Sequence, residues 1–203
     1  MKTLFIPAKI NLEINEKKIL SLNLPINIVI AYSIQYKEVA LKIKEFLSKK
    51  HKILSIIQVL GCSSPKLPEK TEAILLISSG KFHAVSLAAT TNLPVYLLES
   101  DELKKISKEE IELFNKRKKV AYLKFLNAEK IGVLISTKPG QENLKKSLTL
   151  KLKNKIPYFF LSNNINNKEF ENFGINSWIN TACPRLDFDN SIINLQDLEN
   201  LIK

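Results

Sequence analysis

Two cysteines follow the ends of apolar stretches and are the residues best suited to metal or redox chemistry. Cys183 follows the stretch 177–182, Cys62 follows the stretch 56–61, and a proline comes soon after each. Proline cannot donate to a strand ladder, so each apolar strand should end near its cysteine. Ligands of open α/β sheets bind at the carboxyl ends of strands. The two thiols are therefore candidates for ligands that meet over a cleft, with buried structural cysteines as the alternative.

Arginine is rare in this chain and stands beside one of these cysteines. The sequence holds 31 lysines and arginines, of which Arg117 and Arg185 are the arginines. A guanidinium offers a fixed fork of donors that matches a carboxylate. Arg185 is therefore expected to bind an acidic group next to Cys183.

Composition narrows the class of protein. The chain has 203 residues, 45% of them hydrophobic, with a net charge of +11. Its apolar runs have the length of strands, and the sequence shows no signal-peptide pattern, so two cysteines indicate a reducing, cytoplasmic compartment with no membrane partner. The charge suggests an acidic or nucleic-acid partner, but the lysines are spread from Lys37 to Lys155 and not gathered with aromatics. We therefore expect no direct nucleic-acid binding, and lysines that mainly solvate helix faces or reflect compositional bias.

Strands alternate with helices, which predicts a parallel α/β fold. The predicted strands cover residues 4–6, 26–32, 53–60, 73–77, 94–98, 130–135, 158–161, 177–181 and 191–195. The predicted helices cover residues 37–50, 82–91, 107–127, 142–153, 168–173 and 196–203. Ser107 and Glu110 have the spacing of a capping box at the start of the longest helix.

The two halves of the chain have similar patterns. Residues 26–35 match residues 130–141, and residues 73–80 match residues 176–183. A period near one hundred residues predicts two similar α/β domains in tandem. We expect residues 1–25 to be a remnant or linker of a preceding domain, 26–127 to form one domain, and 128–203 to form the next.

Four short motifs then occur in order. They are Val59-Leu60-Gly61-Cys62-Ser63-Ser64-Pro65, Gly80-Lys81-Phe82-His83, Ser136-Thr137-Lys138-Pro139-Gly140-Gln141 and Asn180-Thr181-Ala182-Cys183-Pro184-Arg185-Leu186. Their order and spacing resemble the second and third domains of the archaeal diphthamide synthases, the 2-(3-amino-3-carboxypropyl)histidine synthases. The resemblance runs from about Phe5 to the C-terminus.

This resemblance implies a radical transferase. Members of the family have three similar α/β domains, each of which gives one cysteine to a [4Fe–4S] cluster, and the open iron binds S-adenosylmethionine. The reduced cluster generates a 3-amino-3-carboxypropyl radical, which adds to a histidine of translation elongation factor 2 in the first step of diphthamide formation. The enzymes are dimers. By resemblance, Cys62 and Cys183 are the metal ligands of this chain.

Further residues are expected to contact S-adenosylmethionine. Arg185 is suited to pair with its carboxylate. Gly140 lacks a Cβ and permits close approach, Gln141 offers a donor and an acceptor, and Lys138 precedes them in the same loop. His83 is expected to orient ligand or substrate, with a helix-terminal histidine that satisfies backbone groups as the alternative.

The sequence departs from the family pattern in two places. The first domain and its cysteine are not in this sequence, and residues 78–83 read Ser-Ser-Gly-Lys-Phe-His where the family has Gly-Asp-Gly-Arg-Phe-His. We therefore expect the C-terminal part of a split synthase, completed by a separate first-domain chain in a homo- or hetero-oligomer. The alternative is a non-catalytic binding subunit of the same complex. A zinc or redox protein is disfavoured because the sequence has no Cys-x-x-Cys and no paired histidines.

Overall fold

The chain forms two compact units. The computed structural model describes residues 4, 6, 8–60, 64–100, 102–184 and 190–202. The first unit covers Met1–Phe114 and the second covers Asn115–Lys203. The boundary falls within helix α4 (Lys108–Asn127), whereas the sequence places the second domain from residue 128, and that division stays a prediction.

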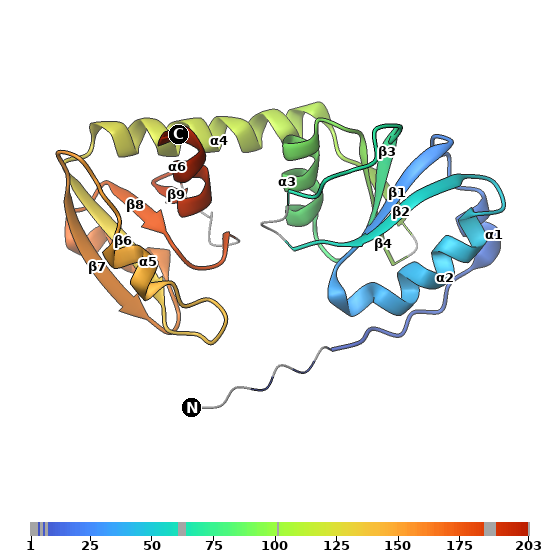
Figure 1. The fold of residues 1–203 in the computed structure, drawn as a ribbon, viewed down its shortest axis with the longest axis horizontal. Coiled ribbons are helices and arrows are strands. Elements are labelled where there is room, and N and C mark those ends of the chain that lie inside the picture. Colours follow the sequence, from blue (N-terminus) through green and yellow to red (C-terminus); the bar gives the residue numbers. More distant parts are fainter. Residues whose placement is uncertain are drawn as a thin grey trace. The chain divides into compact units, whose positions relative to one another are not determined.

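The first unit is built on a sheet that is parallel except at one edge (Figure 1). Its strand order is β2-β1-β3-β4-β5, and β5 runs antiparallel to β4. The strands are β1 (Asn27–Tyr32), β2 (Lys52–Gln58), β3 (Ala73–Ile77), β4 (Val95–Glu99) and β5 (Glu102–Lys105). The helices are α1 (Glu16–Leu20), η1 (Ile34–Tyr36), α2 (Lys37–Leu47) and α3 (Lys81–Thr91).

Both faces of this sheet are covered, which explains its continuous apolar strands. β3 is buried at every position because α1 and α2 pack on one face and α3 on the other. One core cluster joins Ile28 and Leu75 to Ile43 of α2, and another joins Leu76 to Leu87 of α3. Strands buried on both faces are typical of parallel sheets.

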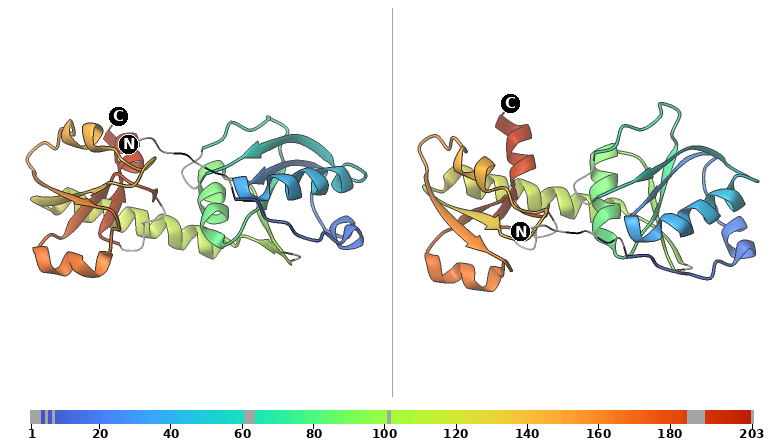
Figure 2. Two further views of the ribbon diagram at one scale, coloured as in Figure 1. Left: turned by 90° about the horizontal axis from the view of Figure 1, so that it is seen from below. Right: turned by 60° about the horizontal axis from the view of Figure 1, so that its bottom comes forward.

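The second unit repeats this arrangement with shorter helices. Its sheet has the order β7-β6-β8-β9, and all pairs are parallel. Its elements are β6 (Lys130–Ser136), α5 (Leu144–Leu148), β7 (Ile156–Ser162), η2 (Asn167–Phe173), β8 (Ser177–Asn180), β9 (Ile192–Asn194) and α6 (Leu195–Ile202). Figure 2 shows α5 and η2 on opposite faces of this sheet.

The two sheets have the same strand order, which confirms the tandem repeat. The strand pairs align Ala73 with Ser177, one residue later than the sequence match of 73–80 with 176–183. β6, β7, β8 and β9 take the places of β1, β2, β3 and β4. The pair Ile28 and Ala73 in the first sheet corresponds to the pair Ile131 and Ser177 in the second, where both pairs lie near the start of their strands. The antiparallel edge strand β5 has no counterpart among the described residues of the second unit.

One sequence feature is confirmed atom by atom. The Ser107 N–H donates to Glu110 Oε2 at 2.9 Å, and the Glu110 N–H donates to Ser107 Oγ at 3.2 Å. This is the reciprocal capping box predicted at the start of α4, and it satisfies two N–H groups that have no partner within the helix.

Several predicted elements are wrong or incomplete. The predicted strand over residues 4–6 is not formed, because Leu4 and Ile6 lie outside any strand and are about 80% exposed, while Phe5 lies outside the described residues. The predicted helix 142–153 is reduced to α5. Its end coincides with Thr149, whose Oγ1 donates to the Lys146 carbonyl at 3.0 Å, a local bond that competes with helix continuation. The short elements α1 and β5 were not anticipated.

The smaller of the two core clusters of the second unit contains the single tryptophan of the chain. Trp178 is 1% exposed, and its ring lies within 4.2 to 6.1 Å of the rings of Phe170, Phe160 and Phe173. It pairs with Gly132 across the strands, where a Cβ would lie 2.1 Å from the indole. Only glycine leaves room for this ring. No helix among the described residues has the length and apolar character that a membrane span requires.

Candidate functional site

The cysteine of the second unit lies just beyond a buried strand. β8 ends at Asn180, and Cys183 follows three residues later as a half-buried free thiol. β6 is the parallel neighbour of β8, so the loop after Ser136 leaves the same edge of the sheet. Parallel strands thus place the cysteine loop and the loop 137–141 at one edge, where α/β folds bind ligands.

The amide side chain of Asn180 holds the cysteine loop. Its Oδ1 accepts from the Ala182 N–H at 2.9 Å, and its Nδ2 donates to the Cys183 carbonyl at 2.9 Å. The same Nδ2 donates to Asn194 Oδ1 at 2.7 Å. Asn180 is 1% exposed and Asn194 is 7% exposed. The two loop contacts fix the orientation of the amide, because a nitrogen must face the carbonyl and an oxygen must face the N–H.

The residue after Asn180 fixes the other side of the loop. Thr181 donates to the Leu134 carbonyl through both its backbone N–H (3.1 Å) and its Oγ1 (2.8 Å). Asn143 Nδ2 donates to the Thr181 carbonyl at 2.6 Å, and Ser147 Oγ lies 3.1 Å from Thr181 Oγ1. Buried polar groups are costly unless they are bonded, and these bonds tie the loop to both β6 and α5.

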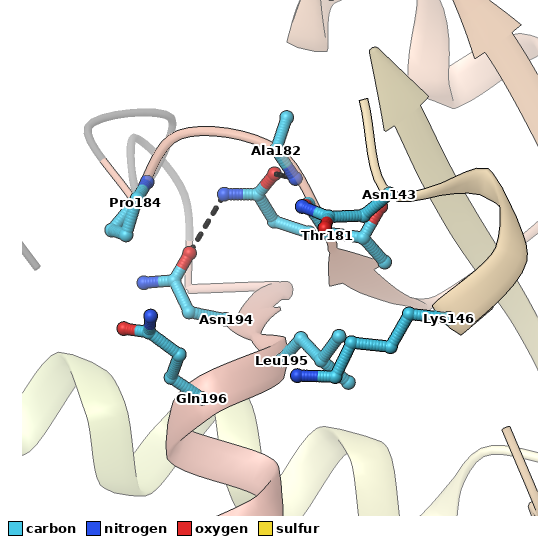
Figure 3. Close-up of a pocket in the computed structure, with 9 residues that line it drawn as sticks. Asn143, Lys146, Thr181, Ala182, Pro184, Asn194, Leu195 and Gln196 are labelled. Carbon is cyan, nitrogen blue, oxygen red and sulfur yellow. Dashed lines mark hydrogen bonds between the residues drawn. The ribbon is translucent and has the colours of Figure 1, made fainter. Parts of the chain in front are cut away.

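A polar cavity of about 120 Å³ lies beside this loop (Figure 3). It is lined by Asn143, Lys146, Asn180, Thr181, Ala182, Pro184, Asn194, Leu195 and Gln196. Figure 3 shows Ala182 and Pro184 of the cysteine loop on one side and Leu195 and Gln196 of α6 on the other, with Asn194 between them. Lys146 lies at its rim and is paired with Glu199 at 2.8 Å.

The neighbouring loop is a tight turn of defined type. The Gln141 N–H donates to the Lys138 carbonyl at 3.0 Å, and Gly140 has φ +78°. Proline at the second position and a glycine with positive φ at the third are the signature of a type II turn. The Lys138 N–H donates to the buried Ser136 Oγ at 3.1 Å. The side chains of Lys138 and Gln141 are half-buried at the same sheet edge.

The corresponding edge of the first unit carries the histidine. After β3, Ser78 is buried, and its Oγ lies 3.4 Å from His83 Nδ1 in the first turn of α3. Gly80 has φ +75°, and its N–H donates to Glu99 Oε1 at 2.8 Å. The family pattern has an aspartate in this loop, and here a carboxylate reaches the loop from the end of β4.

Lys81, which stands where the resemblance leads us to expect an arginine, forms an ion pair. Lys81 Nζ pairs with Glu110 Oε1 at 2.6 Å. This ammonium, together with the Ser107 N–H, holds the pKa of Glu110 below its usual range, despite the opposing effect of burial. Lys81, at the start of α3, therefore also contacts the start of α4.

The described residues include some of the predicted site residues but not all of them. The structure brings Cys183, Lys138, Gly140 and Gln141 to one edge of the second sheet and places His83 at the equivalent edge of the first. Cys62 and Arg185 lie outside the described residues. The network formed by Asn143, Ser147, Asn180, Thr181 and Asn194 was not predicted. Its signal was a run of polar residues at the end of a buried strand, where asparagine is disfavoured.

Comparison with known proteins identifies relatives of this fold. A sequence profile of the diphthamide synthesis protein family matches residues 1–193. The 2-(3-amino-3-carboxypropyl)histidine synthase of Pyrococcus horikoshii is 31% identical over 136 residues, which are 65% of this chain and 40% of that protein. Subunit 1 of the same synthase from Schizosaccharomyces pombe is 32% identical over 148 residues, 68% of this chain and 34% of that protein.

Solved structures agree with the sequence comparison. The crystal structure of Dph2 from Pyrococcus horikoshii superposes with a TM-score of 0.71 at 25% identity, covering 88% of this chain and 57% of that chain. The structure of the same protein with a 4Fe-4S cluster superposes equally well. This chain thus spans about a third to two fifths of the length of these sequence relatives.

Proposed function

Because the chain belongs to the diphthamide synthesis protein family, we propose that it forms the C-terminal part of a 2-(3-amino-3-carboxypropyl)histidine synthase. The reaction transfers the 3-amino-3-carboxypropyl group of S-adenosylmethionine to a histidine of translation elongation factor 2. The observation that carries the proposal is Cys183, a half-buried free thiol in a loop whose backbone is fixed by buried amide and hydroxyl groups.

The thiol at this edge suits one ligand position of an iron–sulfur cluster, and the described residues hold no group of three metal-ligating side chains. Thiolates are the usual protein ligands of such clusters, and Cys183 forms no disulfide with any described residue. Asn180 and Thr181 hold the backbone of this loop, which is the kind of support that a metal-binding residue needs. When bound, such a cluster supplies the electron that breaks a carbon–sulfur bond of S-adenosylmethionine.

We assign the ligand contacts as the sequence suggests. Cys62 and Cys183 are the proposed metal ligands. The type II turn lets a ligand approach Gly140, while Lys138 and Gln141 provide a cation and an amide from the same edge. Arg185 is proposed to pair with the methionine carboxylate, and His83 to orient substrate.

A second polypeptide is proposed to complete the site. The resemblance requires three cysteines, and these 203 residues contain two. We propose that a first-domain chain supplies the third and that two copies of each chain assemble. In this arrangement the 203-residue chain alone binds iron and sulfide poorly.

One observation favours the alternative of a non-catalytic subunit. In the stretch 78–83, the arginine of the family pattern is replaced by Lys81, and the structure pairs that lysine with Glu110. A cation engaged in this way is not directed at a ligand. Such a subunit would keep the fold and the elongation-factor contact and leave catalysis to its partner.

Activity in the assembled complex separates these functions. The 203-residue chain is co-expressed with a first-domain chain, reconstituted anaerobically, and supplied with S-adenosylmethionine, dithionite and elongation factor 2. Modification of the factor is read by mass spectrometry. A synthase modifies the histidine only when both chains are present, and Cys183→Ala abolishes turnover while the exposed-site control Asn163→Ala does not. Full activity of the single chain refutes the split site, and a loaded but inactive complex favours the non-catalytic subunit.

A further inference from the structure

The internal repeat provides a built-in comparison for the cysteine loop. In the second sheet, Asn180 pairs in register with Leu134 on one side and with Asn194 on the other. At the same places of the first sheet, Leu76 pairs with Ala31 and with Leu97. Leu76 and Leu97 are both fully buried. A buried amide pair in one unit thus replaces a buried leucine pair in the other.

This exchange is not required by the fold. Both sheets have the same strand order, although α3 follows β3 whereas no described helix lies between β8 and β9, and the first sheet forms with two leucines at these positions. Buried amides are less favourable than leucines unless their hydrogen-bonding capacity is used. In the second unit, the hydrogen-bonding capacity of the amides is used to hold the loop that carries Cys183. The equivalent loop of the first unit contains no cysteine.

We propose that Asn180 and Asn194 are positioning residues that preform the cysteine loop for its metal. Asn180 holds the Ala182 N–H and the Cys183 carbonyl, and Asn194 Oδ1 accepts from the remaining donor of the Asn180 amide. Neither side chain has a hydrogen bond to the thiol in the structure. They act by fixing the backbone on which the thiol is carried. The role of Cys183 as a metal ligand rests on the proposed function, whereas the fixed conformation of its loop is independent of that function.

The repeat also supplies the test variant. The double variant Asn180→Leu/Asn194→Leu installs the leucine pair of the first unit. The adjacent cavity of about 120 Å³ gives room for the larger side chains. Replacing both partners of a buried hydrogen bond by apolar groups of similar shape is nearly neutral for stability, and the freed Ala182 N–H and Cys183 carbonyl belong to half-buried residues that water can reach. Unit 2 should therefore stay folded, with the Trp178 emission and unfolding midpoint of the unchanged protein, while the loop loses its support.

Two readouts on the full 203-residue chain report the loop directly. Amide exchange by NMR should be about tenfold faster at Ala182 in the double variant, which corresponds to about 1.4 kcal/mol. Exchange at Val133, in the centre of β6, should not change. Alkylation by iodoacetamide, resolved by peptide mass spectrometry, should be about fivefold faster at Cys183, with Cys62 as the internal reference. Asn163→Ala, at an exposed loop position, is the matched control.

Single variants keep the test decisive if the double variant unfolds. Asn180→Ala removes the acceptor of the Ala182 N–H, whereas Asn180→Ser keeps a neutral oxygen that can accept from the N–H two residues on. Exchange at Ala182 should be fast in the first variant and slower in the second. Equal exchange in the unchanged chain and Asn180→Ala overturns the proposal, as do unaltered Ala182 exchange and Cys183 alkylation in a folded double variant.

These outcomes are independent of the proposed enzyme activity. A loop that loosens as expected, in a chain whose complex with the first-domain partner never assembles a cluster, supports the positioning role and refutes the synthase. A cluster that assembles and turns over, with a loop indifferent to Asn180, refutes the positioning role alone. In a loaded complex, loosening should also broaden the electron paramagnetic resonance spectrum of the reduced cluster.

Discussion

Replacing Gly132 by alanine should destabilise the second unit severely. Gly132 lies in β6 beside Trp178, and an added Cβ would lie 2.1, 2.3 and 2.7 Å from three atoms of the indole. Ordinary contacts to a Cβ begin near 3.4 Å, so the ring must move by about 1 Å. Phe170 stacks on the ring at 4.2 Å and Phe160 lies at 4.9 Å, so this movement also displaces the aromatic neighbours of the indole.

The expected cost combines two effects of this movement. Overpacking a closely packed core costs about 1–3 kcal/mol. Displacing the indole also weakens its aromatic pairs, each of which contributes about 0.5–1.5 kcal/mol beyond burial. We therefore expect Gly132→Ala to lower the free energy of unfolding of unit 2 by about 3 kcal/mol. With a urea dependence of about 1 kcal/mol per molar for a small domain, the midpoint falls by about 3 M.

The fluorescence of Trp178 isolates this unit because the chain has no other tryptophan. Urea titrations followed by emission report unit 2, and far-UV circular dichroism reports both units. The Gly132→Ala transition should move to lower urea and the emission should shift to longer wavelength, while the second, unit 1 transition in circular dichroism stays in place.

A double-mutant cycle identifies the indole as the cause. In a Trp178→Leu background the ring is absent, so Gly132→Ala should cost less than about 1 kcal/mol, read by circular dichroism. An equal cost in both backgrounds, or an unchanged midpoint for Gly132→Ala alone, would refute the packing explanation.

Two further predictions concern the loops and caps. Lys81 and the Ser107 N–H lower the pKa of Glu110 in the folded chain. The ionised carboxylate therefore stabilises unit 1 at pH values above its ordinary pKa of 4.5. This stabilisation is lost as the pH falls through the lower pKa of the folded chain. Glu110→Gln should therefore flatten the fall in melting temperature below pH 4.5, and an unchanged slope would rule out this carboxyl as a contributor. Gly140→Ala should speed amide exchange at Gln141 about tenfold, because a left-handed conformation costs alanine about 1–2 kcal/mol. Gly140→Asn should increase the exchange rate less. Equal exchange rates in the unchanged chain and both variants would contradict the type II turn.

Local sequence patterns predicted the central strands and the start of the longest helix. The apolar runs that became β1 and β3 are buried on both faces, and the Ser107 and Glu110 capping box is formed as its spacing indicated. α1 and β5 are short and draw on tertiary contacts, α1 against α2 and β5 against β4, that no periodicity records. The predicted strand at residues 4–6 failed because apolar residues without a pairing neighbour do not make a sheet.

The site was predictable only in part for a similar reason. Cys183 and the Gly140 turn follow from residue type and from the rule that ligands gather at the carboxyl ends of strands. The support of the loop does not, because Asn180 and Asn194 are 14 residues apart and meet only through the register of β8 and β9. The same register shows that the first unit uses leucines there, a comparison that needs the folded sheets.

Iron binding by the assembled complex tests the central claim most directly. The chain and a first-domain partner are reconstituted anaerobically with ⁵⁷Fe and sulfide, and the Mössbauer spectrum and iron content are recorded. We predict one [4Fe–4S] centre per pair of chains, weakened strongly by Cys183→Ala and by Cys62→Ala and unaffected by Asn163→Ala. A Cys183→Ala complex that retains the full cluster signal would contradict the assignment of this loop as a metal ligand.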